Sequence, residues 1–255
     1  MKRFISVMAG AALALSGSIA LAGTPLPPSL GGGGFVPPDA TSNKVEQGAA
    51  KNLTKLAGAV TKCHQKGVGN LIKAKPDGTP NCNATAINKY NASALKLTGV
   101  ACISPSAQAS LGANVAGLVG TFDPTLWCDG VTPIPSTPGG LQGGFVPDAT
   151  DNKTEQAVSK ALIKHVGAVS KCALKGVGNL FKNKPDGATA CISAARVKAD
   201  ASIAKLQTAI NGLTPSDCLK GANAPNPELL NLVTALTLSF NSSLFCASPS
   251  GAFLN

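Results

Sequence analysis

The chain has 255 residues, and its 22 lysines and arginines against 12 acids give a formal net charge of +10. Aromatic residues make up only 4% of it. A core can therefore form, but it must be built mainly from small aliphatic side chains. The few acids leave little material for the paired carboxylates that many hydrolases need.

The N-terminus has the pattern of a bacterial secretory signal. Lys2 and Arg3 precede an apolar stretch over residues 4–21, and Ala20-Leu21-Ala22 fits the small-x-small rule for cleavage. We expect residues 1–22 to be removed, which leaves 20 basic and 12 acidic residues and a net charge of +8. A retained anchor is the alternative, but the stretch is short. No later segment is apolar enough to span a bilayer, so the sequence predicts a secreted or periplasmic protein.

The chain repeats itself. Residues 39–82 align without a gap with residues 148–191 at an offset of 109, and 27 of the 44 positions are identical. Such identity indicates duplication of one structural unit. Segments rich in proline and glycine precede both copies and are typical of flexible or extended linkers. We predict an N-terminal segment 23–38, a first unit 39–129, a linker 130–147 and a second unit 148–255.

The first helix of each unit has the clearest pattern. Apolar residues recur every three or four positions from Ala49 to Leu71, as on one helix face, and the second copy keeps this spacing. Asn43 with Glu46 has capping-box spacing, as has Asn152 with Glu155, which predicts the helix starts. The helix is expected to stop at Lys75-Pro76-Asp77-Gly78, because proline disfavours helix in the preceding residue. Gly67 and Gly69 indicate a break, or a close approach by another helix.

Two further helices are expected in each unit. The second follows Cys82, and its partner spans about residues 193–210 and is capped by Asn211-Gly212. The third spans residues 107–119 in the first unit and 228–240 in the second. Strand signals are almost absent. The predicted fold is all-α, with two tandem disulfide-stapled helical units of about three helices each, joined by a Pro/Gly-rich linker.

All eight cysteines follow the signal, which predicts a disulfide framework. The two units have the same cysteine order: Cys63, Cys82, Cys102 and Cys128, then Cys172, Cys191, Cys218 and Cys246. Four cysteines allow three pairings in each unit. We favour adjacent pairing, which gives Cys63–Cys82, Cys102–Cys128, Cys172–Cys191 and Cys218–Cys246. Spacing by itself leaves the other pairings open.

Lysines form a stripe on the first helix of each unit, opposite its apolar face. Their spacing of 7, 4, 7, 4 and 7 residues places all six on one side of a helix. The candidate anion-binding residues are Lys44, Lys51, Lys55, Lys62, Lys66 and Lys73, and their counterparts Lys153, Lys160, Lys164, Lys171, Lys175 and Lys182. The stripes either keep the protein in solution or contact an acidic partner. Both interpretations stay open here.

Motifs for catalysis, metals and cofactors are missing. His64 aligns with Ala173, and His165 aligns with Leu56, so neither histidine is shared by the copies. His165 lies on the apolar face, where a packing role is expected. No cysteine or histidine spacing suits zinc, and no glycine-rich phosphate loop follows a strand. We therefore expect no enzyme, no catalytic residue, no metal and no cofactor.

These observations predict a secreted, non-enzymatic binding or envelope-associated protein. Its lysine-striped helices would contact an acidic envelope polymer or an anionic lipid surface. Sequence-specific nucleic-acid binding is disfavoured, because arginine is nearly absent and no aromatic residues accompany the stripes. The alternative is a structural or spacer protein of the envelope that has no ligand.

Overall fold

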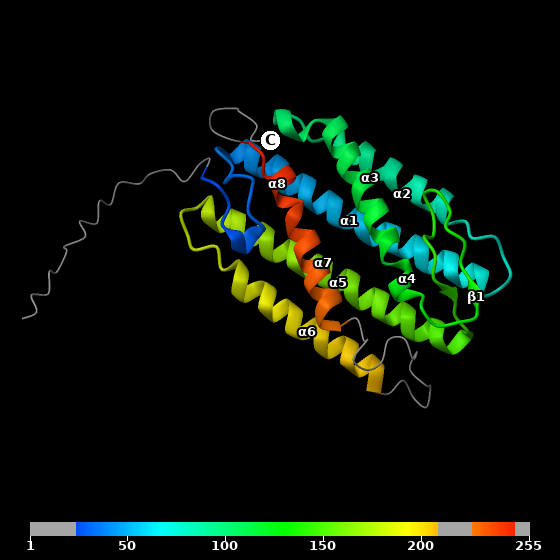
Figure 1. Ribbon diagram of the computed structural model, residues 1–255. Coiled ribbons are helices and arrows are strands. Elements are labelled where there is room, and N and C mark those ends of the chain that lie inside the picture. The colour runs from blue at the N-terminus through cyan, green and yellow to red at the C-terminus, as the bar shows by residue number, and fades with distance from the viewer. Residues whose placement is uncertain (1–23, 209–225, 248–255) are drawn as a thin grey trace, which may run out of the picture.

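The computed structural model describes residues 24–208 and 226–247. It confirms the all-α class, since the described strands are two short segments, β1 (Thr132–Pro133) and β2 (Phe145–Val146), that pair antiparallel. Figure 1 shows two long helices lying side by side at the centre, with the other helices packed around them. Among the described residues, no helix has the length and apolarity needed to cross a membrane.

The two central helices are the equivalent 32-residue helices α1 (Ala40–Leu71) and α5 (Ala149–Leu180). Each begins after an aspartate, Asp39 or Asp148, whose carboxylate accepts hydrogen bonds from two backbone N–H groups of the first turn. The predicted capping boxes at Asn43 and Asn152 are therefore wrong. An aspartate directly after the last proline of each linker is an equally good cap, and it starts the helix earlier.

The close approach at Gly67 explains why a glycine lies inside α1. The helix is continuous there, and a Cβ on Gly67 would collide with Thr79 and Asp77 at the start of α2 (Thr79–Ala94). The Cys63–Cys82 disulfide joins the same two helices. The second half repeats this arrangement with α6 (Ala188–Thr208) and Cys172–Cys191. The predicted cap at Asn211-Gly212 lies outside the described residues.

A third helix follows in each half, and both were expected. The first half has η2 (Ala101–Ile103), α3 (Pro105–Thr121) and the one-turn α4 (Asp123–Leu126). The second half has α7 (Asn226–Ser239) and the one-turn α8 (Asn241–Leu244). Helix α3 packs on α1 and α2, whereas α7 packs on α5 and α6 (Figure 1).

The proline- and glycine-rich segments are packed against the helices. In the first, which includes η1 (Pro28–Leu30), Leu30 and Val36 are buried. In the second, Ile134 and Leu141 are buried. Each segment therefore contributes apolar side chains to the core, although its composition is typical of a free linker.

The contact between α1 and α5 is antiparallel. Gln65 donates a hydrogen bond to Ser159 (3.0 Å). Gly69 faces Gln156, and the equivalent Gly178 faces Gln47. Residue numbers thus rise on one helix as they fall on the other, and the equivalent contacts imply an approximate twofold axis between the helices. Both apolar clusters of the core combine residues from the two halves.

The long-range disulfide corrects the predicted pairing. Cys102 is bonded to Cys246 of the other half, so the expected Cys102–Cys128 and Cys218–Cys246 pairs are wrong, whereas Cys63–Cys82 and Cys172–Cys191 are confirmed. Cys128 is also disulfide-bonded, and Cys218 lies outside the described residues. Disulfides of this kind are typical of extracellular or periplasmic proteins.

The antiparallel helix pair is the physical reason for this pairing. Cys102 lies in η2, which packs near the start of α1, and the residues after α8 also reach α1 there. The backbone of Cys128 lies instead at Glu155, near the start of α5. The starts of the two helices are at opposite ends of a pair about 48 Å long at 1.5 Å per residue. Cys102 and Cys128 are therefore too far apart to bond.

We expect the Cys102–Cys246 disulfide to contribute more stability than the two short-range disulfides. It closes a separation of 144 residues, whereas Cys63–Cys82 and Cys172–Cys191 each close 19. On the chain-entropy account, replacing Cys102 and Cys246 by alanine costs about 2 kcal/mol more than replacing either short-range pair. Denaturant unfolding of the three double variants measures this. The two short-range variants are matched controls, and equal losses in all three would contradict the expectation.

Candidate functional site

The twelve stripe lysines are all on the protein surface. Every one of them is exposed. Ten lie on α1 or α5, and Lys73 and Lys182 lie just after the ends of these helices. Within the part of the chain that the structure describes, none of the twelve forms an ion pair. Their charges are thus available to solvent and to a partner.

The two lysine rows lie on one face of the molecule. On α1 the lysines are opposite the buried Leu53 and Ala57. An antiparallel pair of equivalent helices is related by a twofold axis normal to the plane that contains them. A face that points to one side of that plane on α1 therefore points to the same side on α5. We call this surface the basic face. Gln65 and Ser159 are joined by a hydrogen bond between the two helices, and Lys66 and Lys160 directly follow them. The two rows therefore approach each other at these lysines.

The two acids that interrupt the stripes in the sequence do not lie on the basic face. Glu46 and Glu155 are both fully buried. Glu46 accepts a hydrogen bond from the backbone N–H of Ala247 (2.8 Å), in the other half. Glu155 accepts two from the backbone N–H groups of Cys128 and Asp129 (3.0 Å each). Each glutamate thus accepts hydrogen bonds from backbone N–H groups just after the short last helix of the opposite half.

Burial sets the titration of these two glutamates. Loss of solvent raises the pKa of Glu46 from 4.5 to about 7, and that of Glu155 from 4.5 to about 8, against the opposing effect of the backbone hydrogen bonds. A raised pKa in the folded state means that folding favours the protonated carboxyl. Between pH 4.5 and 8 the folded protein therefore holds protons that the unfolded chain has released.

Stability should consequently fall as the pH rises through this window. Each glutamate contributes about 1.4 kcal/mol per pH unit between its unfolded and folded pKa. In Glu46→Gln/Glu155→Gln, whose amide oxygens still accept the backbone N–H groups, we expect the fall between pH 5 and pH 8.5 to be smaller by a few kcal/mol. Urea unfolding at the two pH values tests this. The control Asp200→Asn changes a half-exposed carboxylate and should lose as much stability between the two pH values as the wild type does. An equally large loss in the glutamine variant would refute the role of the two glutamates.

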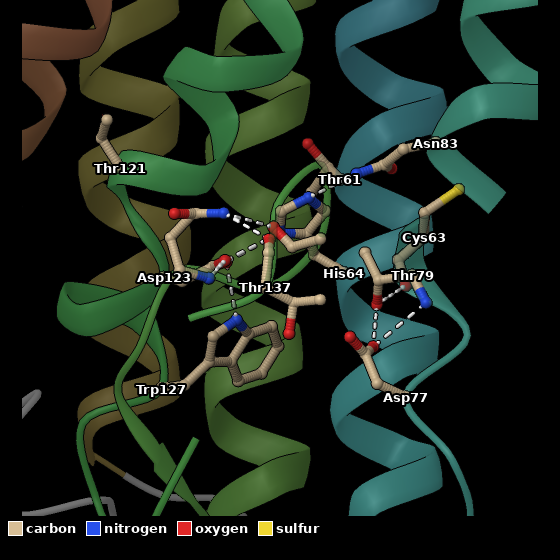
Figure 2. Close-up of polar contacts among 12 residues, drawn as sticks. Thr61, Cys63, His64, Asp77, Thr79, Asn83, Thr121, Asp123, Trp127 and Thr137 are labelled. Atoms are coloured by element: carbon tan, nitrogen blue, oxygen red, sulfur yellow. Dashed lines mark hydrogen bonds and ion pairs between the residues drawn. The ribbon is translucent and has the colours of Figure 1, made fainter. Parts of the chain in front are cut away.

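A buried polar network lies where α1, α2, α4 and the linker meet (Figure 2). His64 Nδ1 lies 2.9 and 3.0 Å from the two carboxylate oxygens of Asp123. The same carboxylate accepts hydrogen bonds from Trp127 Nε1 (3.1 Å) and from the backbone N–H of Gln142 (2.9 Å). Three donors therefore converge on one buried carboxylate.

The network also determines which nitrogen of His64 carries the proton. Asn83 Nδ2 donates to the carbonyl of Gly139 (2.8 Å) and lies 3.1 Å from His64 Nε2. Because that amide nitrogen is a donor, Nε2 accepts and Nδ1–H donates to Asp123. An Asp–His pair of this kind can serve a nucleophile when Nε2 faces a hydroxyl or thiol. Here Nε2 faces an amide instead, and the arrangement ties the linker to α1 and α2.

Sequence comparison of the two halves contained a signal for this network. His64 aligns with Ala173, and Asp123 aligns with Asn241, so both members of the pair change together between the copies. The sequence shows that the histidine is unshared, but it does not identify the partner 59 residues away. In the second half Asn241 donates to the carbonyl of Leu30 (2.8 Å), so the amide holds the N-terminal segment there.

We expect His64→Ala and Asp123→Asn to be strongly coupled. Each single variant leaves a buried partner without its hydrogen bond, which costs about 2–4 kcal/mol. The double variant recreates the Ala173–Asn241 combination and should lose about 1–3 kcal/mol less than the sum of the singles. A double-mutant cycle by urea unfolding measures this coupling. Additive losses would show that the pair is not an energetic unit.

His165 has a packing role, as expected from its place on the apolar face. It is buried, and its Nε2 lies 2.8 Å from the hydroxyl of Thr234. That hydroxyl donates to the carbonyl of Leu230, so it accepts from His165. Burial lowers the pKa of His165, which favours the neutral ring.

One group of residues has the arrangement of a metal site. Ligand atoms of Glu46, Cys102 and Cys246 lie within 4.8 Å of one another. The two sulfurs are bonded to each other, however, so they offer no thiolate to a metal ion. The group therefore acts as a disulfide beside a buried carboxyl.

Comparisons of the chain with known protein families, with curated proteins and with solved structures gave no match.

Proposed function

We propose that this chain is an exported, non-enzymatic protein that binds an acidic polymer or an anionic surface through the basic face. The observation that carries the proposal is the gathering of twelve exposed lysines from two copies on one side of the α1–α5 pair. Sequence duplication alone would allow the two rows to point in opposite directions. The proposal includes removal of residues 1–22 and an origin of residues 39–129 and 148–255 as two copies of one unit.

The chemistry of the basic face favours loose, charge-driven binding. Lysine is a flexible point charge without the planar fork of arginine, so it recognises the density of anions and not one geometry. The glutamates that would neutralise the rows are buried. Among the residues that the structure describes, the exposed large apolar side chains are Leu95, Val131, Phe145, Val197 and Leu232, on neither α1 nor α5. The face therefore has no apolar anchor for insertion into a bilayer, which supports contact with an acidic polymer or with anionic headgroups.

The test is retention on heparin and on phosphatidylglycerol vesicles as a function of salt. In Lys51→Gln/Lys55→Gln/Lys62→Gln/Lys66→Gln we expect at least tenfold weaker binding at low salt. The slope of log affinity against log salt should also fall, by roughly 0.7 to 0.9 per lysine, if counterion release drives the contact as it does on nucleic acids.

A matched control separates the basic face from net charge. Lys89→Gln/Lys96→Gln/Lys198→Gln/Lys205→Gln removes four exposed lysines from α2, the loop after it, and α6, so both variants have the same net charge. The control should bind nearly as well as the wild type. Equal weakening in both variants would reject the basic face as the site. Absence of binding by the wild type at low salt would favour a ligand-free envelope spacer.

A further inference from the structure

An apolar cavity of about 110 Å³ lies between α1, α3, α5 and α7 and is partly open to solvent. It lies on the side of the α1–α5 pair opposite the basic face, because the floor is formed by residues such as Leu53 and Ala57 that point away from the lysines. No single small ligand could therefore occupy the cavity and touch the lysine rows. Any function of the cavity is independent of the function proposed above.

The cavity lies on the approximate twofold axis. Its walls contain equivalent residues from the two halves: Leu53 and Leu162 from the central helices, Val115 and Val233 from α3 and α7, and Phe122 and Phe240 at the ends of those helices. The cavity is thus created by the association of the halves, and neither half alone encloses it.

The walls are apolar even where the residues are polar by type. The hydroxyls of Thr54, Thr61 and Thr237 each donate to the carbonyl of the residue four positions earlier. Asp123 is occupied by its three donors, and Ser159 accepts from Gln65. A charged or strongly polar occupant would lose its hydration without replacement, which is costly. An uncharged apolar occupant suits these walls.

A small side chain on the floor leaves space that protein atoms do not fill. The rim of the cavity is accessible to solvent. Ala57 lines the floor where its equivalent in α5 is the larger Val166. Unfilled apolar volume lowers stability in proportion to its size, and a larger side chain at position 57 would remove some of it. The rim residues Leu118 and Phe122, with their equivalents Leu236 and Phe240, are only half-buried, so a route from solvent passes between α3 and α7.

We propose that this cavity is a binding site for a small uncharged apolar molecule, with the size of benzene or of a short hydrocarbon. Apolar cavities of about 150 Å³ in other proteins stay dry and take up benzene or xenon. The cavity described here is of that order, it is reachable from solvent, and most of the polar groups in its walls are already paired. Its ligand would be held by dispersion and exclusion from water alone.

The experiment is a titration of the full mature chain with benzene, followed by NMR of methyl groups. We expect saturable shifts at Leu53, Leu162 and Val115, and smaller changes elsewhere. Xenon under pressure should shift the same methyl groups. Shifts that grow linearly without saturation, or that are spread over the surface, would overturn the proposal.

Two filling variants and one control make the test specific. Ala57→Leu and Thr237→Leu each place a larger side chain in the cavity and should weaken benzene binding at least tenfold. The control Ala59→Leu adds the same volume on α1 at a residue that does not line the cavity, and should bind as the wild type does. Thermal unfolding shows which variants are folded, and having two filling sites keeps the test decisive if one variant fails to fold. Unchanged benzene binding in a folded filling variant would refute the site.

A second copy of the chain is the competing occupant of the cavity. In that case the cavity methyl shifts would follow protein concentration, sedimentation would show a dimer, and benzene would not saturate a site in the monomer. That outcome would also overturn the proposal. The filling variants should be retained on heparin as the wild type is, and the lysine variants should still bind benzene. The two proposals are therefore tested separately.

Discussion

The antiparallel packing of α1 against α5 is the contact on which the rest of the structure depends. It places equivalent residues of the two halves around one approximate twofold axis. It is made through small and amide side chains, among them Gly69, Gly178 and the bonded Gln65 and Ser159, which allow the two helices to lie close together. Because the helices run in opposite directions, the start of each one is brought to the far end of the other.

The halves are interlocked as a consequence. The residues just after α8 lie at the start of α1, where Glu46 and Cys102 hold them. The residues just after α4 lie near the start of α5, where Glu155 holds them. The proline- and glycine-rich segments follow the same rule, since Phe35 donates to the carbonyl of Phe245 (2.6 Å) and Phe145 to that of Trp127 (2.7 Å). The core consequently extends across both halves and is not divided between them.

The same axis gives the molecule two chemically opposite sides. The basic face carries lysines from both copies without compensating acids, because Glu46 and Glu155 are used in the interior. The other side holds the apolar cavity between α3 and α7. The asymmetry between the halves lies at the edge of that cavity, where His64 and Asp123 replace the alanine and asparagine of the second copy. Two halves of similar structure can differ in this way only if both members of a buried pair differ together.

Much of the local structure was determined by the sequence alone: the all-α class, the long first helices, and the short-range Cys63–Cys82 and Cys172–Cys191 disulfides. These features depend on residues close in the chain, through helical periodicity and proline placement. The helix starts were predicted wrongly because Asn43 and Glu46 have the spacing of a cap. Asp39 is the residue that caps the helix, and Glu46 instead accepts a hydrogen bond from the backbone of Ala247, 201 residues away. The Cys102–Cys246 bond, the partner of His64 and the cavity were decided only by tertiary structure. They depend on how α1 and α5 pack together. Periodicity and cysteine spacing are local patterns along the chain, and they do not determine whether two helices far apart in sequence pack parallel or antiparallel.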